Sequence, residues 1–157
     1  MSEPRRKLAA DAWGALLQVH AALVPTLESQ VRAQTGLPLT WYDVLLELAG
    51  APDGKLRMTV LAERVVLSRT RVSRLVDELS EVGLVCREEN PHDRRSAYAV
   101  LTDTGRSRFR NAAPIYLAAI ESSFAAGLSN EDLQDIKRAL LRVRSHIDAS
   151  PTPRSRR

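Results

Sequence analysis

The chain has 157 residues, 44% of them hydrophobic and 27% charged, which is typical of one globular domain or two small coupled ones. It has no apolar run of the roughly 18 residues that a membrane span requires, and its first residues lack a signal-peptide core. The single cysteine, Cys86, excludes an intrachain disulfide framework. We therefore expect a soluble cytoplasmic protein with no membrane partner.

The net charge of +4 is unevenly distributed. Six of the 23 basic residues but one of the 19 acidic residues lie in 1–7 and 151–157, so the segment 8–150 carries 17 basic and 18 acidic residues. Within that segment, residues 64–74 contain four arginines and no acid, and Arg94 and Arg95 form a second cluster. Such clusters are more often solvated faces than binding sites, so their position in the fold must decide.

The first predicted element is a long helix over residues 8–34, in which apolar residues recur at helical spacing. Pro25 is expected to kink it, and residues 36–38 to end it. A second apolar strip runs beside the first, so the helix should contact two different bodies. This second strip consists of Trp13, Leu17, His20 and Val24.

Three shorter helices are predicted next, each from a residue type that caps helix N-termini. Thr40, with Asp43 as the partner in an approximate capping box, is expected to begin the first. Thr59 is expected to begin a short helix over 60–65. Ser68 is expected to begin a third, which runs to about residue 81 before Gly83 stops it.

Two strands, 84–89 and 97–101, are predicted on either side of a loop over 90–95. Thr102 is then expected to cap a long helix that Pro114 kinks, and Ser129 with Asp132 to begin an amphipathic last helix. The fold class is therefore all-α with a small β-hairpin wing. We divide it into a helical dimerisation region (8–36 and 106–148), a winged helix-turn-helix DNA-binding lobe (37–105), and basic, disordered tails (1–7 and 149–157).

The helix that Ser68 begins carries the most informative pattern. Val72, Leu75, Val76 and Leu79 fall on one face, and their burial fixes which side points inward. The opposite side then presents donors that suit guanine edges, phosphates or other base edges. The donors are Arg69, Thr70, Arg71, Ser73 and Arg74, and the acidic Asp77 lies on the same side. With the short helix before it, this helix forms a helix-turn-helix outline, although exposed arginines on an ordinary surface helix would give the same pattern.

The predicted hairpin favours the nucleic-acid interpretation. Its tip carries Asp93, Arg94 and Arg95, and arginines at the tip of a β-ribbon can enter a minor groove. Asp93 would repel phosphate, so its expected role is to hold a neighbouring arginine through a charge-assisted hydrogen bond.

Four ordered pieces of the sequence resemble the MarR-type transcription regulators. They are Leu61-Ala62, the string from Ser73-Arg74-Leu75-Val76-Asp77 to Gly83-Leu84-Val85-x-Arg87, Asp93-Arg94-Arg95, and Leu101-Thr102-x-x-Gly105. The resemblance implies a homodimer that binds a palindromic operator on double-stranded DNA. It also implies repression relieved by a small, often aromatic or phenolic, ligand. The flanking helices match the family's arrangement as well.

Carried over onto this sequence, the resemblance implies that Ser68 begins the recognition helix, with the five polar residues named above as groove contacts. It implies that Arg95 is the minor-groove residue and Asp93 its brace. Ser96 stands where the family usually has glycine, which leaves the loop conformation open. The apolar stripes of the first and last helices independently favour a dimer, because one small winged helix cannot cover both.

A ligand site is expected where the dimer helices meet the lobe. Trp13, His20 and Tyr42 are the candidate residues, since an apolar pocket with a polar anchor would need such side chains. The alternative is hinge packing, with His20 hydrogen-bonded to a backbone carbonyl. Cys86 is not expected to be a redox sensor, and the three histidines with Cys86 lack the spacing of zinc ligands. We expect no metal and no cofactor.

Two other classes of function fit the sequence less well. An enzyme is not expected, because the sequence has no nucleophile elbow, phosphate-cradling loop or paired-carboxylate motif. A winged-helix module for protein or RNA would not need arginines at both the helix start and the wing tip. A DNA-binding regulator without any ligand also remains an alternative.

Overall fold

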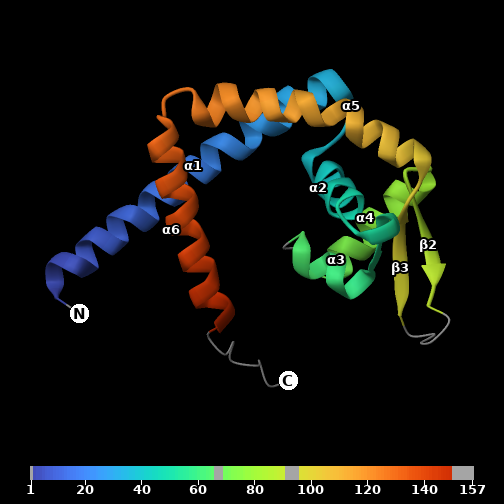
Figure 1. The fold of residues 1–157 in the computed structure, drawn as a ribbon, viewed down its shortest axis with the longest axis horizontal. Coiled ribbons are helices and arrows are strands. Elements are labelled where there is room, and N and C mark those ends of the chain that lie inside the picture. Colours follow the sequence, from blue (N-terminus) through green and yellow to red (C-terminus); the bar gives the residue numbers. More distant parts are fainter. Residues whose placement is uncertain (1, 66–68, 91–95, 150–157) are drawn as a thin grey trace.

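The computed structural model of the chain describes residues 2–65, 69–90 and 96–149, with the backbone alone for Arg69 (Figure 1). The helices are α1 (Glu3–Thr35), α2 (Leu39–Ala49), α3 (Met58–Arg64), α4 (Arg69–Glu81), α5 (Asp103–Ile120) and α6 (Asn130–Ala149). A lobe of short helices and strands lies at one end of the two long helices, α1 and α5 (Figure 1). The last helix, α6, begins near the opposite end of α5. A 3-10 turn, η1 (Pro52–Gly54), precedes the first strand, and a π-helical turn, η2 (Glu121–Ala125), follows α5.

The predicted hairpin is present and has a third partner. Strands β2 (Val85–Glu89) and β3 (Ala97–Leu101) pair antiparallel, and β1 (Lys55–Arg57) pairs with the other edge of β3, giving the order β1-β3-β2. The predicted fold class, mostly helical with a small antiparallel sheet, is confirmed. The sequence predicted two strands in this sheet, and the structure has three. A three-residue strand is too short to show a period of two, so β1 was missed.

Two predicted helix caps are wrong. Helix α2 begins at Leu39 after Pro38, with no side-chain cap, because the Leu39 amide donates to Glu28 Oε2 of α1 at 2.7 Å. A tertiary partner therefore replaces the expected Thr40 cap. Helix α3 begins at Met58 directly after β1, so Thr59 already lies inside its first turn.

The caps predicted at Thr102 and at Ser129 with Asp132 are confirmed. The amide of Gly105 donates to Thr102 Oγ1 at 3.0 Å, and the amide of Asp132 donates to Ser129 Oγ at 3.2 Å. Asp132 Oδ2 accepts from the Ser129 hydroxyl and amide in return, and these hydrogen bonds lower the pKa of its carboxyl. Helix α1 begins at Glu3, so residues 3–7, which were expected to be a disordered tail, are helical. Helices α1 and α5 continue through Pro25 and Pro114 as single elements.

The main hydrophobic core lies inside the lobe and under the first half of α5. It gathers buried residues from α2, α3, α4 and all three strands, including Leu45, Leu48, Leu61, Val76 and Ala99. A smaller core lies where α1 crosses α5, around Leu27, Val31 and Ala119. The lobe therefore has a complete core within one chain. Among the described helices, none is long and apolar enough to cross a membrane.

Candidate nucleic-acid interface

Helix α4 is oriented as its sequence predicts. Val72, Val76 and Leu79 are fully buried and Leu75 is 7% exposed, so this face is fixed against the core. Thr70, Arg71 and Arg74 on the other side are exposed. A groove of about 390 Å³ runs along that side, lined by Thr70, Arg71, Arg74, Leu75 and Glu78. Burial of one face thus holds two arginines and a hydroxyl on a solvent-facing helix surface.

The turn after α4 fixes the direction in which the hairpin leaves the helix. Gly83 adopts a left-handed conformation (φ 73°), and the Leu84 amide donates back to the Leu79 carbonyl at 2.9 Å. The Thr102 hydroxyl lies 2.8 Å from the Gly83 carbonyl and 3.0 Å from that of Leu84, so it can donate to either. A Cβ on Gly105 would lie 2.0 Å from the Leu84 oxygen, which explains the glycine of the Leu-Thr-x-x-Gly string.

Arg87 joins the hairpin to α4. From β2, its Nη2 donates to the Ser73 carbonyl at 3.0 Å and to Ser73 Oγ at 2.8 Å, and it lies 2.8 Å from Asp77 Oδ1. Arg87 was part of the family-like string but was given no role from sequence. Its spacing from α4 along the chain contains no signal for this contact, because the contact depends on how the hairpin folds back.

The base of the wing is closed by a polar pair in which Asn90 is buried and Ser96 half-buried. Asn90 is 2% exposed, and its backbone N–H donates to the Ser96 carbonyl at 3.3 Å. The side-chain Nδ2 of Asn90 lies 2.8 Å from Ser96 Oγ. The serine that replaces the family's usual glycine thus contributes a hydrogen-bonding side chain at the foot of the loop. Ser68, Asp93, Arg94 and Arg95 lie outside the described residues, as does the side chain of Arg69.

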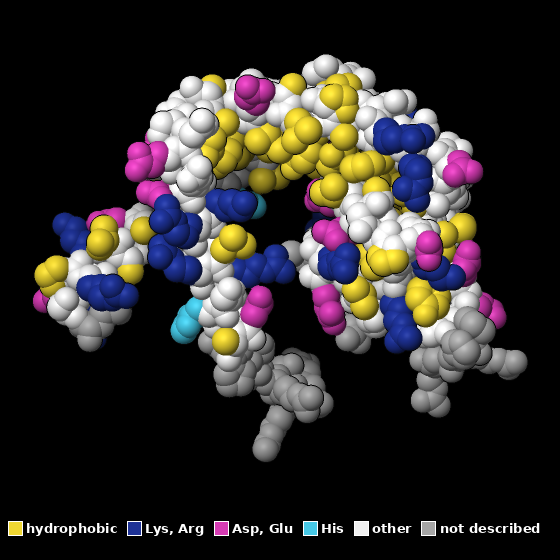
Figure 2. Space-filling view, viewed as in Figure 1, with side chains coloured by type: hydrophobic (Ala, Val, Ile, Leu, Met, Phe, Trp, Pro, Cys, Tyr) yellow, Lys and Arg dark blue, Asp and Glu magenta, His cyan; other side chains and the backbone are white. Residues whose placement is uncertain are grey.

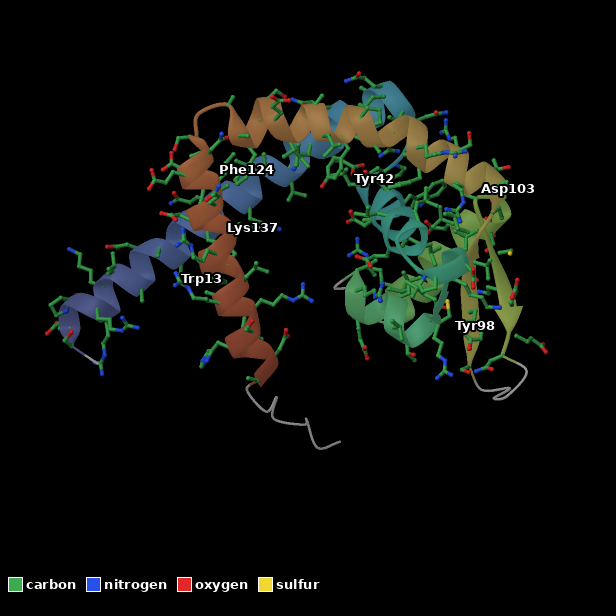
Figure 3. All side chains as sticks on the ribbon, viewed as in Figure 1. Trp13, Tyr42, Tyr98, Asp103, Phe124 and Lys137 are labelled. Atoms are coloured by element: carbon green, nitrogen blue, oxygen red, sulfur yellow. The ribbon has the colours of Figure 1, made fainter. Side chains whose placement is uncertain are left out.

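A second charged cluster lies on the face of the sheet that carries Tyr98 (Figure 3). Lys55 Nζ pairs with Glu88 Oε2 and sits 4.6 Å from the centroid of the Tyr98 ring. Arg57 Nε donates to the Tyr98 hydroxyl at 3.4 Å. Because successive strand residues point to opposite faces, Glu88 ties β2 to the sheet while its neighbour Arg87 ties β2 to α4.

The three residues predicted to line a ligand pocket are not brought together within one chain. Trp13 is 60% exposed and His20 is exposed, whereas Tyr42 is 3% exposed in the lobe core. Figure 3 shows Trp13 on α1 well separated from Tyr42. The Tyr42 ring packs at a tilt against Tyr116 (centroids 4.6 Å apart) and Phe109 (5.4 Å). Burial, followed by Tyr116 and Asp43, raises the pKa of the Tyr42 hydroxyl.

The structure has an apolar cavity that the sequence did not predict, away from Trp13, His20 and Tyr42. A cavity of about 550 Å³ opens between α1, η2 and the start of α6, where yellow side chains gather in Figure 2. Its lining comprises Val19, Ala22, Leu23, Thr26, Ser123, Phe124, Gly127, Leu128 and Ile136. None of the three predicted pocket residues belongs to it. Cys86 is exposed, not buried, and among the described residues no group of metal-ligating side chains could hold an ion.

Comparison with known proteins connects this architecture to one family. A model of the MarR family matches residues 35–96. Over 79 residues the chain is 34% identical to the HTH-type transcriptional regulator YkoM of Bacillus subtilis, covering 50% of this chain and 51% of that relative. It is 26% identical over 127 residues to the transcriptional repressor MprA of Escherichia coli K12, covering 80% of this chain and 72% of MprA. The chain therefore spans about half the length of the first relative.

The similarity to solved structures extends over nearly the whole chain. The MarR-family regulator Sco3205 of Streptomyces coelicolor, in a crystal structure with DNA, superposes with a TM-score of 0.86 at 28% identity, covering 98% of this chain and 94% of that chain. AbsC of the same organism gives a TM-score of 0.82 at 29% identity, covering 96% and 98%. These relatives are transcriptional regulators, not enzymes. With its amphipathic α4, its three-stranded sheet and these matches, the chain is similar over nearly its whole length to winged-helix transcriptional regulators of the MarR family.

Proposed function

We propose that this protein is a sequence-specific regulator that binds a palindromic operator on double-stranded DNA as a homodimer. The observation that carries the proposal is the orientation of α4. Four buried residues fix one face to the core, so that Thr70, Arg71 and Arg74 must face solvent. In the major groove, such side chains can read base edges or hold phosphates.

Within this proposal, Ser68 and Arg69 contribute the first contacts at the N-terminus of α4, where the helix dipole favours phosphate. Arg94 and Arg95 contact the minor groove from the wing tip, with Asp93 as the brace. Sco3205, the structural relative solved with DNA, supports this use of the fold.

A homodimer is proposed because the terminal helices leave apolar side chains uncovered in one chain. The exposed large hydrophobic residues of α1 and α6 are Leu8, Trp13, Leu16, Leu17, Val19, Val24, Leu140, Leu141, Val143 and Ile147. A second copy related by a two-fold axis would cover them and would place two lobes on half-sites about 34–36 Å apart. The helical dimerisation region and the DNA-binding lobe are thus proposed as separate parts of one chain.

The test begins with selection of DNA fragments by the purified protein, followed by gel-shift titration on the selected sequence. Arg74→Ala should cost about 1–3 kcal/mol on that operator if Arg74 reads a base. An equal loss on scrambled DNA would make it a phosphate contact instead. Arg110→Ala, an exposed arginine on α5, is the matched control and should leave the affinity unchanged. Arg95→Ala should weaken binding strongly, and an unchanged affinity would refute the wing assignment.

Salt dependence separates DNA binding from a protein-interaction module. If the dimer neutralises about eight phosphates, log K should fall with the logarithm of the salt concentration at a slope of about −7. A winged helix that docks on protein would bind no selected fragment with such a slope.

Repression that is relieved by a small aromatic or phenolic ligand is the finer form of the proposal. Its support is the repressor MprA among the relatives, together with the aromatic and apolar groups around Tyr42 and the cavity beside Phe124. Trp13, His20 and Tyr42 remain candidate ligand residues only if the second copy brings them together. Thermal-shift screening with aromatic acids tests the idea, because a ligand of the folded state raises Tm and should then release operator DNA. If none does both, the regulator acts without such a ligand.

A further inference from the structure

Asp77 places a negative charge on the side of α4 that the proposed function turns toward DNA. It lies one turn after Ser73 on the exposed side, and its side chain is 56% exposed. An uncompensated carboxylate near a phosphate backbone would weaken binding. Arg87 compensates it at 2.8 Å while donating two hydrogen bonds to Ser73.

Folding stability does not explain this arrangement well. The Arg87 side chain is 35% exposed, and ion pairs this close to solvent contribute little to the free energy of folding. The contact instead fixes the position of β2 relative to α4. Three oxygen atoms of α4, two from Ser73 and one from Asp77, surround Nη2 of Arg87 on β2. The next residue, Glu88, pairs with Lys55 of β1. Strand β2 is therefore held to α4 by one residue and to the rest of the sheet by its neighbour.

We propose that Arg87 is a positioning residue for DNA recognition. It locks the wing hairpin against the recognition helix, so that both approach the duplex as one rigid body, and it screens the charge of Asp77. Ser73 then serves as an acceptor for Arg87, and its role in DNA binding is exerted through Arg87 instead of through a base. This inference rests on the proposed function, because it concerns the same DNA-reading surface.

A double-mutant cycle on Arg87 and Asp77 tests the proposal, with affinity measured on the selected operator. Arg87→Ala should weaken binding about tenfold to a hundredfold, as loss of a charged hydrogen-bonding group does. Asp77→Ala alone should also weaken binding, although it removes a negative charge from the DNA-facing side. In the Arg87→Ala background, Asp77→Ala should instead strengthen operator binding, because it then removes an unscreened negative charge.

The alternative is that Arg87 contacts a phosphate directly. Asp77→Ala would then strengthen binding in both backgrounds, and that result would overturn the proposal. The salt slope gives a second criterion. Arg87 and Asp77 together carry no net charge, so the double variant should keep the slope of the natural protein. A direct phosphate contact would instead make the slope shallower by about 1.8, since the dimer would lose one contact from each copy.

Glu88→Ala is the matched control, because it breaks the neighbouring ion pair on the same strand without touching α4. Its thermal unfolding should resemble that of Arg87→Ala, while its operator affinity stays close to that of the natural protein. An equal loss of affinity in both variants would reduce Arg87 to a general stabiliser of the strand and would refute the proposal.

A measurement without DNA separates failure of this inference from failure of the proposed function. Amide hydrogen exchange over β2 should accelerate in Arg87→Ala and in Asp77→Ala, and more than in Glu88→Ala near the α4 contact. If the natural protein selects no DNA and exchange still follows this order, the brace holds and the proposed function fails. If exchange over β2 is unchanged in both variants, the brace itself is wrong.

Discussion

The lobe and the terminal helices differ in how much of their apolar surface one chain can bury. In the lobe, three helices and three strands close around a core whose central side chains are inaccessible to solvent. Helix α6, by contrast, has 20 residues and none of them is buried, and α1 buries only Leu27 and Val31 of its 33 residues. A complete core folds within one chain, whereas amphipathic helices without a core require a partner surface.

The largest effect is expected from a core substitution in the lobe. Leu48→Ala removes a fully buried side chain where the surrounding elements converge, and should lower the free energy of unfolding by about 2–5 kcal/mol. Urea unfolding measures this. The cost should be similar at low and high protein concentration, because the lobe core lies within one chain. A cost that depends strongly on concentration would contradict the idea of a self-contained lobe.

The opposite behaviour is expected on α6. Ile147 is 63% exposed in the single chain, so Ile147→Asp should have little effect on a monomer. If a second copy covers it, the substitution should lose about 1.5–3 kcal/mol per copy and dissociate the dimer. Sedimentation across a range of concentrations measures the change. A monomeric natural protein, or an unaltered dimer in the variant, would break the contrast between the two regions.

The junction of lobe and helices is tested by Gly105→Ala. The new Cβ would meet the Leu84 oxygen, and the required shift should cost about 1–3 kcal/mol. Thermal unfolding is the measurement. Gly50→Ala is the control, since its Cβ would only make ordinary contact with the Leu46 carbonyl at 3.5 Å. Equal effects of the two substitutions would contradict the close approach at Gly105.

The smallest effect concerns Asp43 on α2, and its sign is definite. Partial burial, followed by Glu47 and Glu28, raises the pKa of its carboxyl. The folded state therefore favours protonated Asp43, and this contribution to stability is lost as the pH rises through the raised pKa. Asp43→Asn should raise Tm modestly at neutral pH, and the gain should shrink toward acid as Asp43 protonates in both states. A rise in Tm that is independent of pH would show that the raised pKa of Asp43 is not its cause.

Patterns that depend on neighbours along the chain were predicted well. The buried stripe of α4, the strands around the wing, and the caps at Thr102 and Ser129 all involve residues within one or two helical turns or adjacent strand positions. The predicted Thr40 cap is wrong because the helix begins at Leu39, whose backbone N–H donates to Glu28, eleven residues earlier in the chain. Strand β1 was missed because its three residues are too few to show a period of two, and its pairing of Lys55 with Val100 joins segments that are distant in the chain.

The sequence by itself determined which faces of its helices are apolar, where the hairpin lies, and that basic residues gather at the start of α4, because these properties follow from local periodicity and residue type. Only the tertiary structure decided that Arg87 contacts Ser73 and Asp77, that Tyr42 lies in the lobe core away from Trp13, and that no residue of α6 is buried by the part of the chain that the structure describes. Contacts between distant segments depend on how the elements pack. A linear pattern does not encode that packing in any short window.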